Sequence, residues 1–191
     1  MSHSEDATPP GWREIDARTR AAGFDMPSEP GVGALLRTLA AVKRGGRLLE
    51  LGTGSGLATA WLVDGMDADA RLISIDNDAA VQSIGRSVLG GDPRLTFIVG
   101  DGLAWLAEQA DESFDLVFAD AWPGKYEGVE DALRLLAPGG LYVVDDMLPQ
   151  RNWPEGHQVR VDALVAFLEN RADLAITRLD WASGLIMAAR R

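Results

Sequence analysis

Cysteine is absent from the 191 residues, and lysine and histidine occur only twice each. Without cysteine there can be no disulfides, thiolate metal sites or cysteine nucleophiles, and its absence fits a reducing compartment. No apolar run approaches the ~20 residues that a membrane-spanning helix requires. The polar, acidic start of the chain lacks the basic and apolar stretches of a signal peptide. These absences predict a cytoplasmic protein with no membrane partner.

The chain also has few basic side chains: 18 lysines and arginines stand against 29 aspartates and glutamates, which gives a net charge of −11. The arginines are scattered along the sequence. Proteins that bind nucleic acid usually carry a basic stripe that neutralises phosphates. We therefore expect no nucleic-acid partner, and we attribute most of the acidity to solubility.

The length predicts one domain. We expect residues 1–10 to be a disordered N-terminus and residues 11–191 to form a single domain. The apolar runs that predict strands are Leu48–Leu51, Leu72–Ile75, Leu95–Val99, Leu116–Ala119, Leu141–Val144, Leu174–Arg178 and Leu185–Ala188. The stretches that predict helices are Trp12–Ala22, Val32–Lys43, Leu57–Val63, Ala79–Leu89, Leu103–Glu108, Tyr126–Leu136 and Gln158–Asn170.

Strands that are almost entirely apolar and alternate with helices indicate a parallel sheet covered on both faces. Only the short segment Trp181–Gly184 separates the last two strands, so they should form an antiparallel hairpin. The predicted fold is α/β: a Rossmann-like, doubly wound, mostly parallel seven-stranded sheet with N-terminal helices and a C-terminal antiparallel hairpin.

A glycine-rich turn follows the first predicted strand, where residues 50–56 read Glu-Leu-Gly-Thr-Gly-Ser-Gly. Glycines at alternate positions let the backbone turn sharply and approach a ligand closely. In open α/β sheets, ligands bind at the carboxyl ends of the strands. A loop of this kind can also be a tight turn and nothing more. Because Leu57 follows Gly56, the dinucleotide fingerprint G-x-G-x-x-G is incomplete.

Acidic residues follow the next two strands. Asp76 lies 24 positions beyond Gly52 and is suited to accept hydrogen bonds from both hydroxyls of a ribose. It could instead cap the following helix, although Asp78 is the better placed cap. Asp101, in the run Gly-Asp-Gly after the third strand, could cap a helix and also contact a ligand.

These motifs resemble those of the class I S-adenosylmethionine-dependent methyltransferases. The resemblance implies that Asp76 holds the ribose and that the segment around Asp101 contacts the adenine. No basic residue stands in the glycine loop to meet a pyrophosphate, and Glu50 would favour the positive sulfonium, unless it is only a strand-end carboxylate. The cofactor-binding residues that the resemblance implies are Glu50, Gly52, Thr53, Gly54, Ser55, Asp76, Asn77, Gly100, Asp101, Gly102 and Asp120.

Three more aspartates follow the fourth and fifth strands: Asp120, Asp145 and Asp146. Carboxylates that converge at one sheet edge repel one another unless a cation or proton offsets them, and Mg²⁺ or Ca²⁺ is the natural partner. They could instead cap strand ends without a metal. The arrangement resembles the metal-dependent, catechol-type O-methyltransferases, which implies that these three residues bind a divalent ion that chelates the hydroxyls of a small acceptor.

Two positions depart from that family. Asp146 stands where the family usually has asparagine, and Pro123 stands at the position of its catalytic lysine. Lys125 is the nearest lysine. We expect it near the start of the following helix, where it could serve with Asp120 in catalysis as a general base; the alternative is a solvent-exposed lysine.

The segment 147–157 is a long loop at the same edge, where loops tend to carry specificity. We expect His157 to begin the next helix rather than to bind metal. Trp122 and Trp153 could stack on a flat acceptor or pack in the core.

The sequence thus predicts S-adenosylmethionine-dependent O-methylation of a small hydroxylated acceptor. Mg²⁺ or Ca²⁺ is the candidate second cofactor, and a homodimer is the candidate assembly. One alternative is a non-catalytic S-adenosylmethionine-binding protein, which Pro123 would favour. A second is a nicotinamide-dependent oxidoreductase, which Leu57 disfavours. A third is a methyltransferase acting on protein or nucleic acid, although the fourth strand lacks the Asn-Pro-Pro-aromatic motif of many such enzymes.

Overall fold

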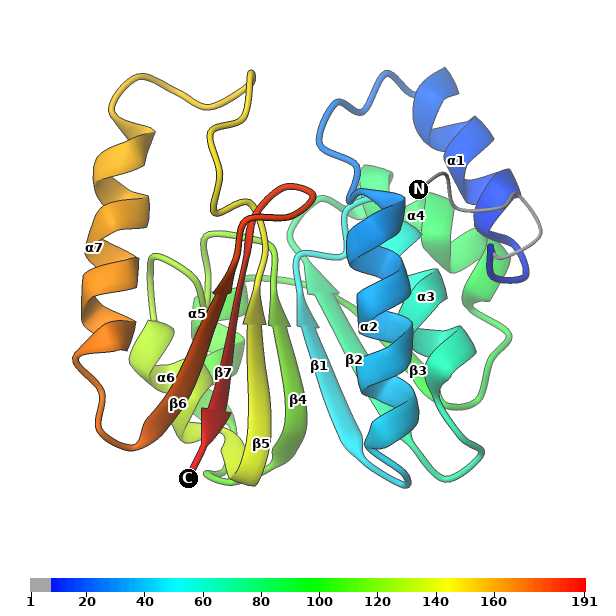
Figure 1. Cartoon of the computed structure of the whole chain (residues 1–191). Helices are drawn as coiled ribbons and strands as arrows, with labels where there is room; N and C mark the ends of the chain where they lie inside the picture. The colour runs from blue at the N-terminus through cyan, green and yellow to red at the C-terminus, as the bar shows by residue number, and fades with distance from the viewer. Residues whose placement is uncertain (1–7) are drawn as a thin grey trace.

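The computed structural model describes residues 8–191, which build one seven-stranded sheet in the order β3-β2-β1-β4-β5-β7-β6 (Figure 1). The strands are β1 Arg47–Leu51, β2 Arg71–Asp76, β3 Leu95–Val99, β4 Phe114–Ala119, β5 Leu136–Val144, β6 Leu174–Leu179 and β7 Leu185–Arg190. Strands β1 to β5 pair in parallel, and β7 pairs antiparallel with both β5 and β6. The predicted doubly wound sheet with its C-terminal hairpin is confirmed.

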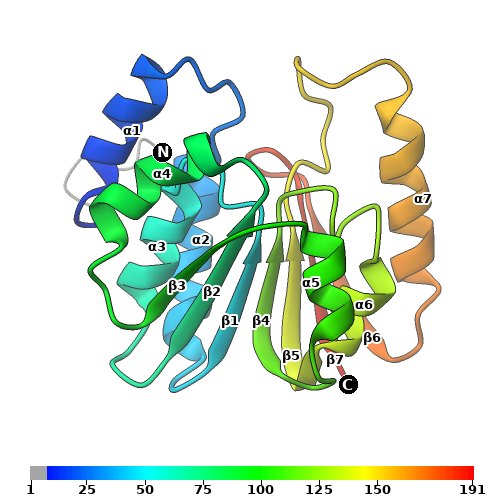
Figure 2. The ribbon, with the colours of Figure 1, turned by 180° about the vertical axis from the view of Figure 1, so that it is seen from behind.

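Helices cover both faces of this sheet (Figures 1 and 2). They are α1 Trp12–Ala21, α2 Pro30–Val42, α3 Leu57–Gly65, α4 Ala79–Leu89, α5 Gly102–Glu108, α6 Val129–Arg134 and α7 His157–Glu169. Leu48 of β1 packs with α2 and α3 in one apolar cluster, whereas Leu49 packs with α5, α6 and α7 in another. Both faces of the strand are therefore buried, which explains its nearly continuous apolar sequence.

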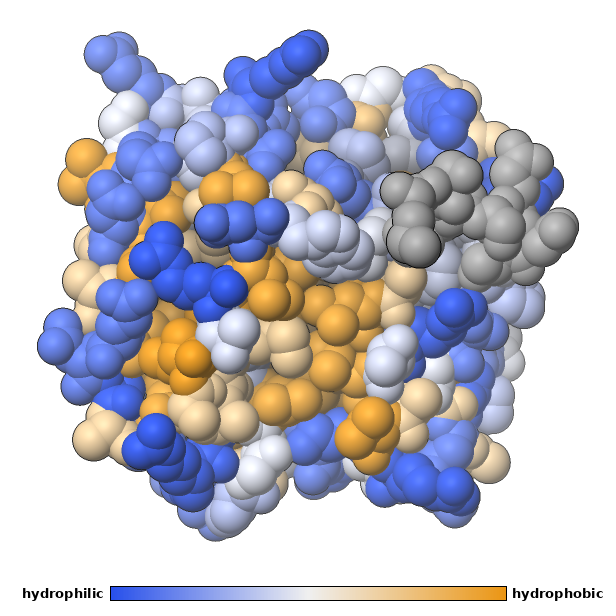
Figure 3. Space-filling view, in the orientation of Figure 1, coloured by the Kyte–Doolittle hydropathy of each residue, from blue (hydrophilic) through white to orange (hydrophobic). Residues whose placement is uncertain are grey.

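The helical cover is thinner over β5 and β7, which are visible between α2 and α7 in Figure 1. Figure 3 shows apolar residues gathered on this side of the molecule. Leu35, Leu141, Leu179 and Met187 are partly buried there against the α2–α3 cluster.

The predicted helix Tyr126–Leu136 is wrong at both ends. Gly128 adopts a left-handed conformation (φ 67°), so the helix begins only at Val129. Its last predicted residue, Leu136, already belongs to β5. The residues before Gly128 fold into a separate turn, and that turn shapes the site described below.

The predicted disordered segment 1–10 lies mostly outside the described residues. Of its last three residues, Pro9 is buried, and its carbonyl accepts a hydrogen bond from the Trp12 N–H at 3.1 Å. Among the helices of residues 8–191, none combines the length and the apolar character needed to cross a membrane.

Candidate functional site

A cavity of about 830 Å³, here called the first cavity, opens at the carboxyl ends of β1, β2 and β4. Its wall contains the glycine loop, the end of β2 and the turn after β3. The predicted cofactor residues in this wall are Gly52, Thr53, Gly54, Ser55, Asp76, Asn77, Gly100, Asp101, Gly102 and Asp120. The structure thus brings together ten residues that lie up to 68 positions apart in the sequence.

The glycine loop needs its glycines for space as well as for conformation. Gly52 has φ 97°, and a Cβ there would lie 2.9 Å from the backbone oxygen of Asp120. A Cβ at Gly56 would lie 2.8 Å from the Cα of Gly85 in α4. Only glycine lets the loop pack this closely against β4 and α4 while its backbone faces the first cavity.

The sequence left open whether Asp76 caps α4 or faces a ligand, and whether Asp78 is the cap. Asp78 caps α4, accepting hydrogen bonds from the N–H groups of Ala80 and Val81 at 2.9 and 3.0 Å. Asp76 lies in the wall of the first cavity and accepts the Gly54 N–H at 2.8 Å. Capping by Asp78 is therefore confirmed, and Asp76 connects β2 to the glycine loop.

Asp101 lies at a helix start and in the cavity wall, and its contact with a ligand stays a prediction. It caps α5, accepting hydrogen bonds from the N–H groups of Leu103 and Ala104 at 2.8 and 3.3 Å. It also lies in the wall of the first cavity.

Glu50 lies beneath the glycine loop rather than in the wall of the first cavity. Its side chain is fully buried and accepts hydrogen bonds from the hydroxyls of Thr59, at 2.6 Å, and Ser74. Ser74 in turn contacts the hydroxyl of Thr53, which accepts a hydrogen bond from Gln82 at 3.0 Å. Glu50 therefore supports the loop from below through a buried polar network.

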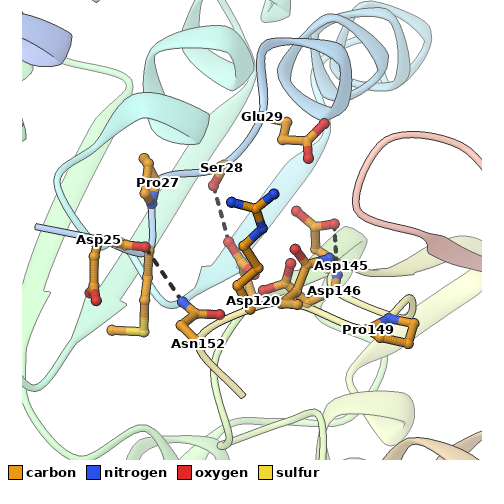
Figure 4. Close-up of a pocket in the computed structure, with 12 residues that line it drawn as sticks. Asp25, Pro27, Ser28, Glu29, Asp120, Asp145, Asp146, Pro149 and Asn152 are labelled. Atoms are coloured by element: carbon orange, nitrogen blue, oxygen red, sulfur yellow. Dashed lines mark hydrogen bonds between the residues drawn. The ribbon is translucent and has the colours of Figure 1, made fainter.

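A second cavity of about 500 Å³ adjoins the first, and Figure 4 shows its lining. It is lined by Asp25, Met26, Pro27, Ser28, Glu29, Asp120, Asp145, Asp146, Pro149, Gln150, Arg151 and Asn152. Asp120 lies in the walls of both cavities. The predicted aspartates after β4 and β5 are thus brought together beside the first cavity.

The segment 24–29 contributes to the walls of both cavities, and no sequence pattern indicated its role. Phe24 lies over the glycine loop, because a Cβ at Gly54 would be 3.4 Å from its ring. The hydroxyl of Ser28 donates to Asp120 at 3.0 Å. Only the location of this segment before α2 could have been read from the sequence, since it matches no motif.

Asp145 is buried, Asp120 and Asp146 are half-buried, and the pKa values of these three aspartates are raised. Burial raises the pKa of Asp120 well above its usual range, and the charges of Asp145 and Asp146 add to the effect. Burial raises the pKa of Asp145 to about 6, although Asp145 accepts hydrogen bonds from the Ser183 hydroxyl and the Asp146 N–H. Asp146 has the left-handed φ of 53°, a strained conformation that is common at functional sites.

Asp120, Asp145 and Asp146 are the residues of the predicted metal site. The carboxylate oxygens have the right chemistry for Mg²⁺ or Ca²⁺. However, within residues 8–191 no group of three or more His, Cys, Asp or Glu side chains is positioned to hold a metal ion. Ser28 and Ser183 already donate to two of the three aspartates. The arrangement as it stands does not fit a metal ion.

Lys125 is buried, with 4% of its surface exposed, so the alternative of a solvent-exposed lysine is wrong. Gly124 (φ 79°) turns the chain inward, and its carbonyl accepts a hydrogen bond from the hydroxyl of Tyr142. A backbone β-bridge between Pro123 and Glu127 closes the turn. The positive charge of Lys125 lowers the pKa of all three aspartates against the effect of burial. The turn therefore brings Lys125 back toward the aspartates despite Pro123.

Aromatic residues pack beside this turn. His157 begins α7, as predicted, and its Nε2 lies 3.0 Å from the hydroxyl of Tyr126. Burial lowers the pKa of His157, and the charges of Lys125 and Arg160 lower it further. The ring centroid of Trp153 lies 4.5 Å from that of His157 with the planes tilted by 44°, whereas Trp122 is 42% exposed and lies in the wall of the first cavity. Trp122 is therefore available to a ligand.

A profile of the methyltransferase domain matches residues 49–147, about half of the chain and all of the glycine loop. A protein of Mycobacteroides abscessus, provisionally named an O-methyltransferase, is 31% identical over 203 residues, a match that covers 100% of this chain and 94% of the relative. The chain belongs to the S-adenosylmethionine-dependent O-methyltransferases.

A further relative agrees with this methyltransferase assignment, and a solved structure agrees with the fold. A similarly named protein of Mycolicibacterium vanbaalenii is 36% identical over 150 residues, which is 75% of this chain and 66% of the relative's length. The crystal structure of the Bacillus cereus O-methyltransferase in complex with S-adenosylhomocysteine has a TM-score of 0.85 at 23% identity, covering 98% of this chain and 94% of that one. The second comparison supports the fold alone.

Glu50 gives this methyltransferase a pH-dependent stability. Burial raises its pKa from 4.5 to about 7, so its stabilising contribution is full below pH 4.5 and is lost as the pH rises through 7. Between pH 5 and pH 8, we expect the unfolding free energy of the wild type to fall by about 2.5 kcal/mol more than that of the Glu50→Gln variant, whose side chain resembles protonated glutamate. Urea unfolding at several pH values measures this difference. Parallel pH profiles for the two proteins would contradict it, and Glu108→Gln, at an exposed position, is the control.

Proposed function

We propose that this chain transfers the methyl group of S-adenosylmethionine to a hydroxyl group of a small acceptor. The observation that carries the proposal is the pair of adjoining cavities with Asp120 in both walls. The first contains ten of the predicted cofactor residues, and the second is of the size that small ligands occupy.

In this proposal the cofactor lies in the first cavity. Asp76 accepts hydrogen bonds from the ribose hydroxyls, while the segment 100–102 contacts the adenine. The amino-acid part lies over the bend of Gly52–Ser55, where backbone can approach it closely. The carboxylate of Asp120 then lies on the side from which an acceptor would reach the methyl group.

The chemical step is an in-line displacement at the methyl carbon. The acceptor oxygen forms a bond to carbon as the carbon–sulfur bond breaks, and S-adenosylhomocysteine leaves. Holding oxygen, carbon and sulfur in line can supply up to about 7–11 kcal/mol of the barrier. We assign Asp120 to receiving the proton of the acceptor hydroxyl, and Lys125, as a cation, to stabilising the negative charge that develops on the oxygen.

The proposed reaction needs no divalent cation, because no group of three or more acidic or histidine side chains within residues 8–191 is positioned to hold one. With an uncharged catechol such as 4-ethylcatechol as acceptor, we expect the rate of methyl transfer in EDTA to stay within about twofold of the rate in Mg²⁺. The reason is that Lys125 supplies positive charge beside the three aspartates. A loss of about tenfold or more in EDTA that Mg²⁺ or Ca²⁺ restores would show that a metal does take part.

The same assay separates the alternatives. A non-catalytic binding protein would bind S-adenosylhomocysteine without turning over any acceptor. The burial of Lys125 removes the support that Pro123 gave to that alternative. An oxidoreductase would bind NAD, and the incomplete fingerprint at Leu57 argues against it. A homodimer and a cytoplasmic location stay predictions.

A further inference from the structure

Lys125 is buried, yet it forms no ion pair within residues 8–191. Its amine contacts the ring of Tyr126 instead: Nζ lies over the ring, 5.1 Å from its centre. The face of an aromatic ring attracts an ammonium group at this distance, and more strongly where water is excluded. A lysine side chain is long and flexible unless a neighbour restricts it. Tyr126 therefore restricts where the ammonium group can lie.

The ring of Tyr126 is held in turn by His157. The Tyr126 hydroxyl and His157 Nε2 lie 3.0 Å apart, and the two rings meet edge to face, with centres 5.1 Å apart and planes at 86°. Burial raises the pKa of Tyr126 and lowers the pKa of His157. The tyrosine is therefore a phenol that donates this hydrogen bond, and the histidine is a neutral imidazole that accepts it at Nε2.

The imidazole of His157 has no second hydrogen bond to justify its burial. Only 7% of the residue is exposed, and Nδ1 is buried without a hydrogen-bond partner among residues 8–191. Because Nε2 accepts, Nδ1 carries the proton, and a buried N–H group is left unpaired. Burying such a group costs stability, and an apolar side chain at this position would avoid the cost. The hydrogen bond to Tyr126 is what the imidazole contributes here.

The three side chains join two parts of the site. Lys125 and Tyr126 belong to the turn after β4, whereas His157 begins α7 at the end of the segment 147–157. Residues 149–152 of that segment line the second cavity. Tyr126 and His157 themselves lie in the wall of neither cavity. They are therefore placed to act through Lys125 and not by touching an acceptor.

We propose that Tyr126, held by His157, positions the Lys125 ammonium group for methyl transfer. This inference rests on the proposed function, in which that ammonium stabilises the negative charge developing on the acceptor oxygen. Both are positioning residues, since neither touches the reacting atoms. The ring of Tyr126 has the larger effect because it contacts the ammonium directly, whereas the hydrogen bond from His157 acts one contact further away.

The test measures steady-state methyl transfer to 4-ethylcatechol by variants of Tyr126. Tyr126→Leu removes the ring, and we expect kcat to fall by about tenfold because the stabilising charge is no longer held in place. Tyr126→Phe keeps the ring and loses only the hydrogen bond to His157, so its kcat should recover to within about two- to threefold of the wild type. The KM for the acceptor and the affinity for S-adenosylhomocysteine should stay within about twofold in both variants.

Repeating both substitutions in the Lys125→Met background separates positioning from a merely structural role. Without the ammonium there is nothing to position, so Tyr126→Leu or Tyr126→Phe should then lower kcat by less than about 1.5-fold further. Phe167→Leu in the wild-type background is the matched control. The guanidinium of Arg171 lies 5.7 Å from the centre of the Phe167 ring, and Phe167 lies in neither cavity wall. This control should leave kcat unchanged.

An unchanged kcat in Tyr126→Leu, or an equal loss with and without Lys125, would overturn the inference. If Tyr126→Leu does not fold, Tyr126→Phe decides alone: its loss must appear in the wild-type background and vanish in Lys125→Met, and any other result overturns the inference. Failure of the proposed function is a different observation, namely no methyl transfer by the wild type or a wild-type rate in Lys125→Met alone, and it would overturn both.

Discussion

The Lys125→Met variant is expected to lower kcat for methyl transfer by about 10²- to 10³-fold, the usual range for loss of a group that stabilises charge developing in the transition state. Methionine keeps the unbranched, buried side chain and removes only the amine. The affinity for S-adenosylhomocysteine should stay within about twofold, because Lys125 does not lie in the wall of the first cavity. Steady-state kinetics and calorimetry on the same preparation measure both quantities.

The chain offers a matched control, since Lys43 is its only other lysine. Lys43 donates to the carbonyl of Gly139 at 2.8 Å, far from both cavities. Lys43→Met should leave kcat unchanged. A Lys125→Met enzyme with wild-type kcat and an unaltered pH–rate profile would remove Lys125 from the catalytic machinery, while a fall in kcat with an unchanged melting temperature would support its role.

The Asp76→Ala variant is expected to weaken the binding of S-adenosylhomocysteine by about 100-fold. Hydrogen bonds to a charged carboxylate contribute about 1.5–3 kcal/mol each, and the ribose offers two hydroxyls. The substitution also removes the acceptor of the Gly54 N–H, so the glycine loop loses one of its hydrogen bonds to β2. Calorimetric titration measures the loss of affinity.

Asp69→Ala is the matched control for this experiment, because Asp69 is exposed and precedes β2, whereas Asp76 ends it. The control should bind the cofactor product as the wild type does. If Asp76→Ala also retained wild-type affinity, the ribose would not lie at the end of β2, and the placement of the cofactor would have to be revised.

The sequence predicted the elements whose signals are local. The apolar strands and the glycine loop were evident, because a strand buried on both faces must be apolar and a tight loop must contain glycine. The place of Asp76 and Asp101 in the wall of the first cavity could be predicted because Asp76 ends β2, Asp101 comes shortly after β3, and the strand ends of a parallel sheet meet at one edge.

The remaining features depend on contacts between distant parts of the chain. The burial of Lys125 follows from the Pro123–Glu127 bridge and from Tyr142, which no local pattern indicated. Ser28 meets Asp120 across 92 positions, and Ser183 meets Asp145 across 38. Glu50 follows the family motif, yet its neighbours Thr59 and Ser74 turn it beneath the loop. Such positions are fixed by tertiary packing and could not be read from spacing.

The most direct test of the central claim is a calorimetric titration of the wild-type protein with S-adenosylhomocysteine and, separately, with NAD. If the first cavity is a cofactor site of this kind, S-adenosylhomocysteine binds with one-to-one stoichiometry and NAD gives no saturable heat. Saturable binding of NAD, or no binding of S-adenosylhomocysteine by a folded sample, would contradict the account.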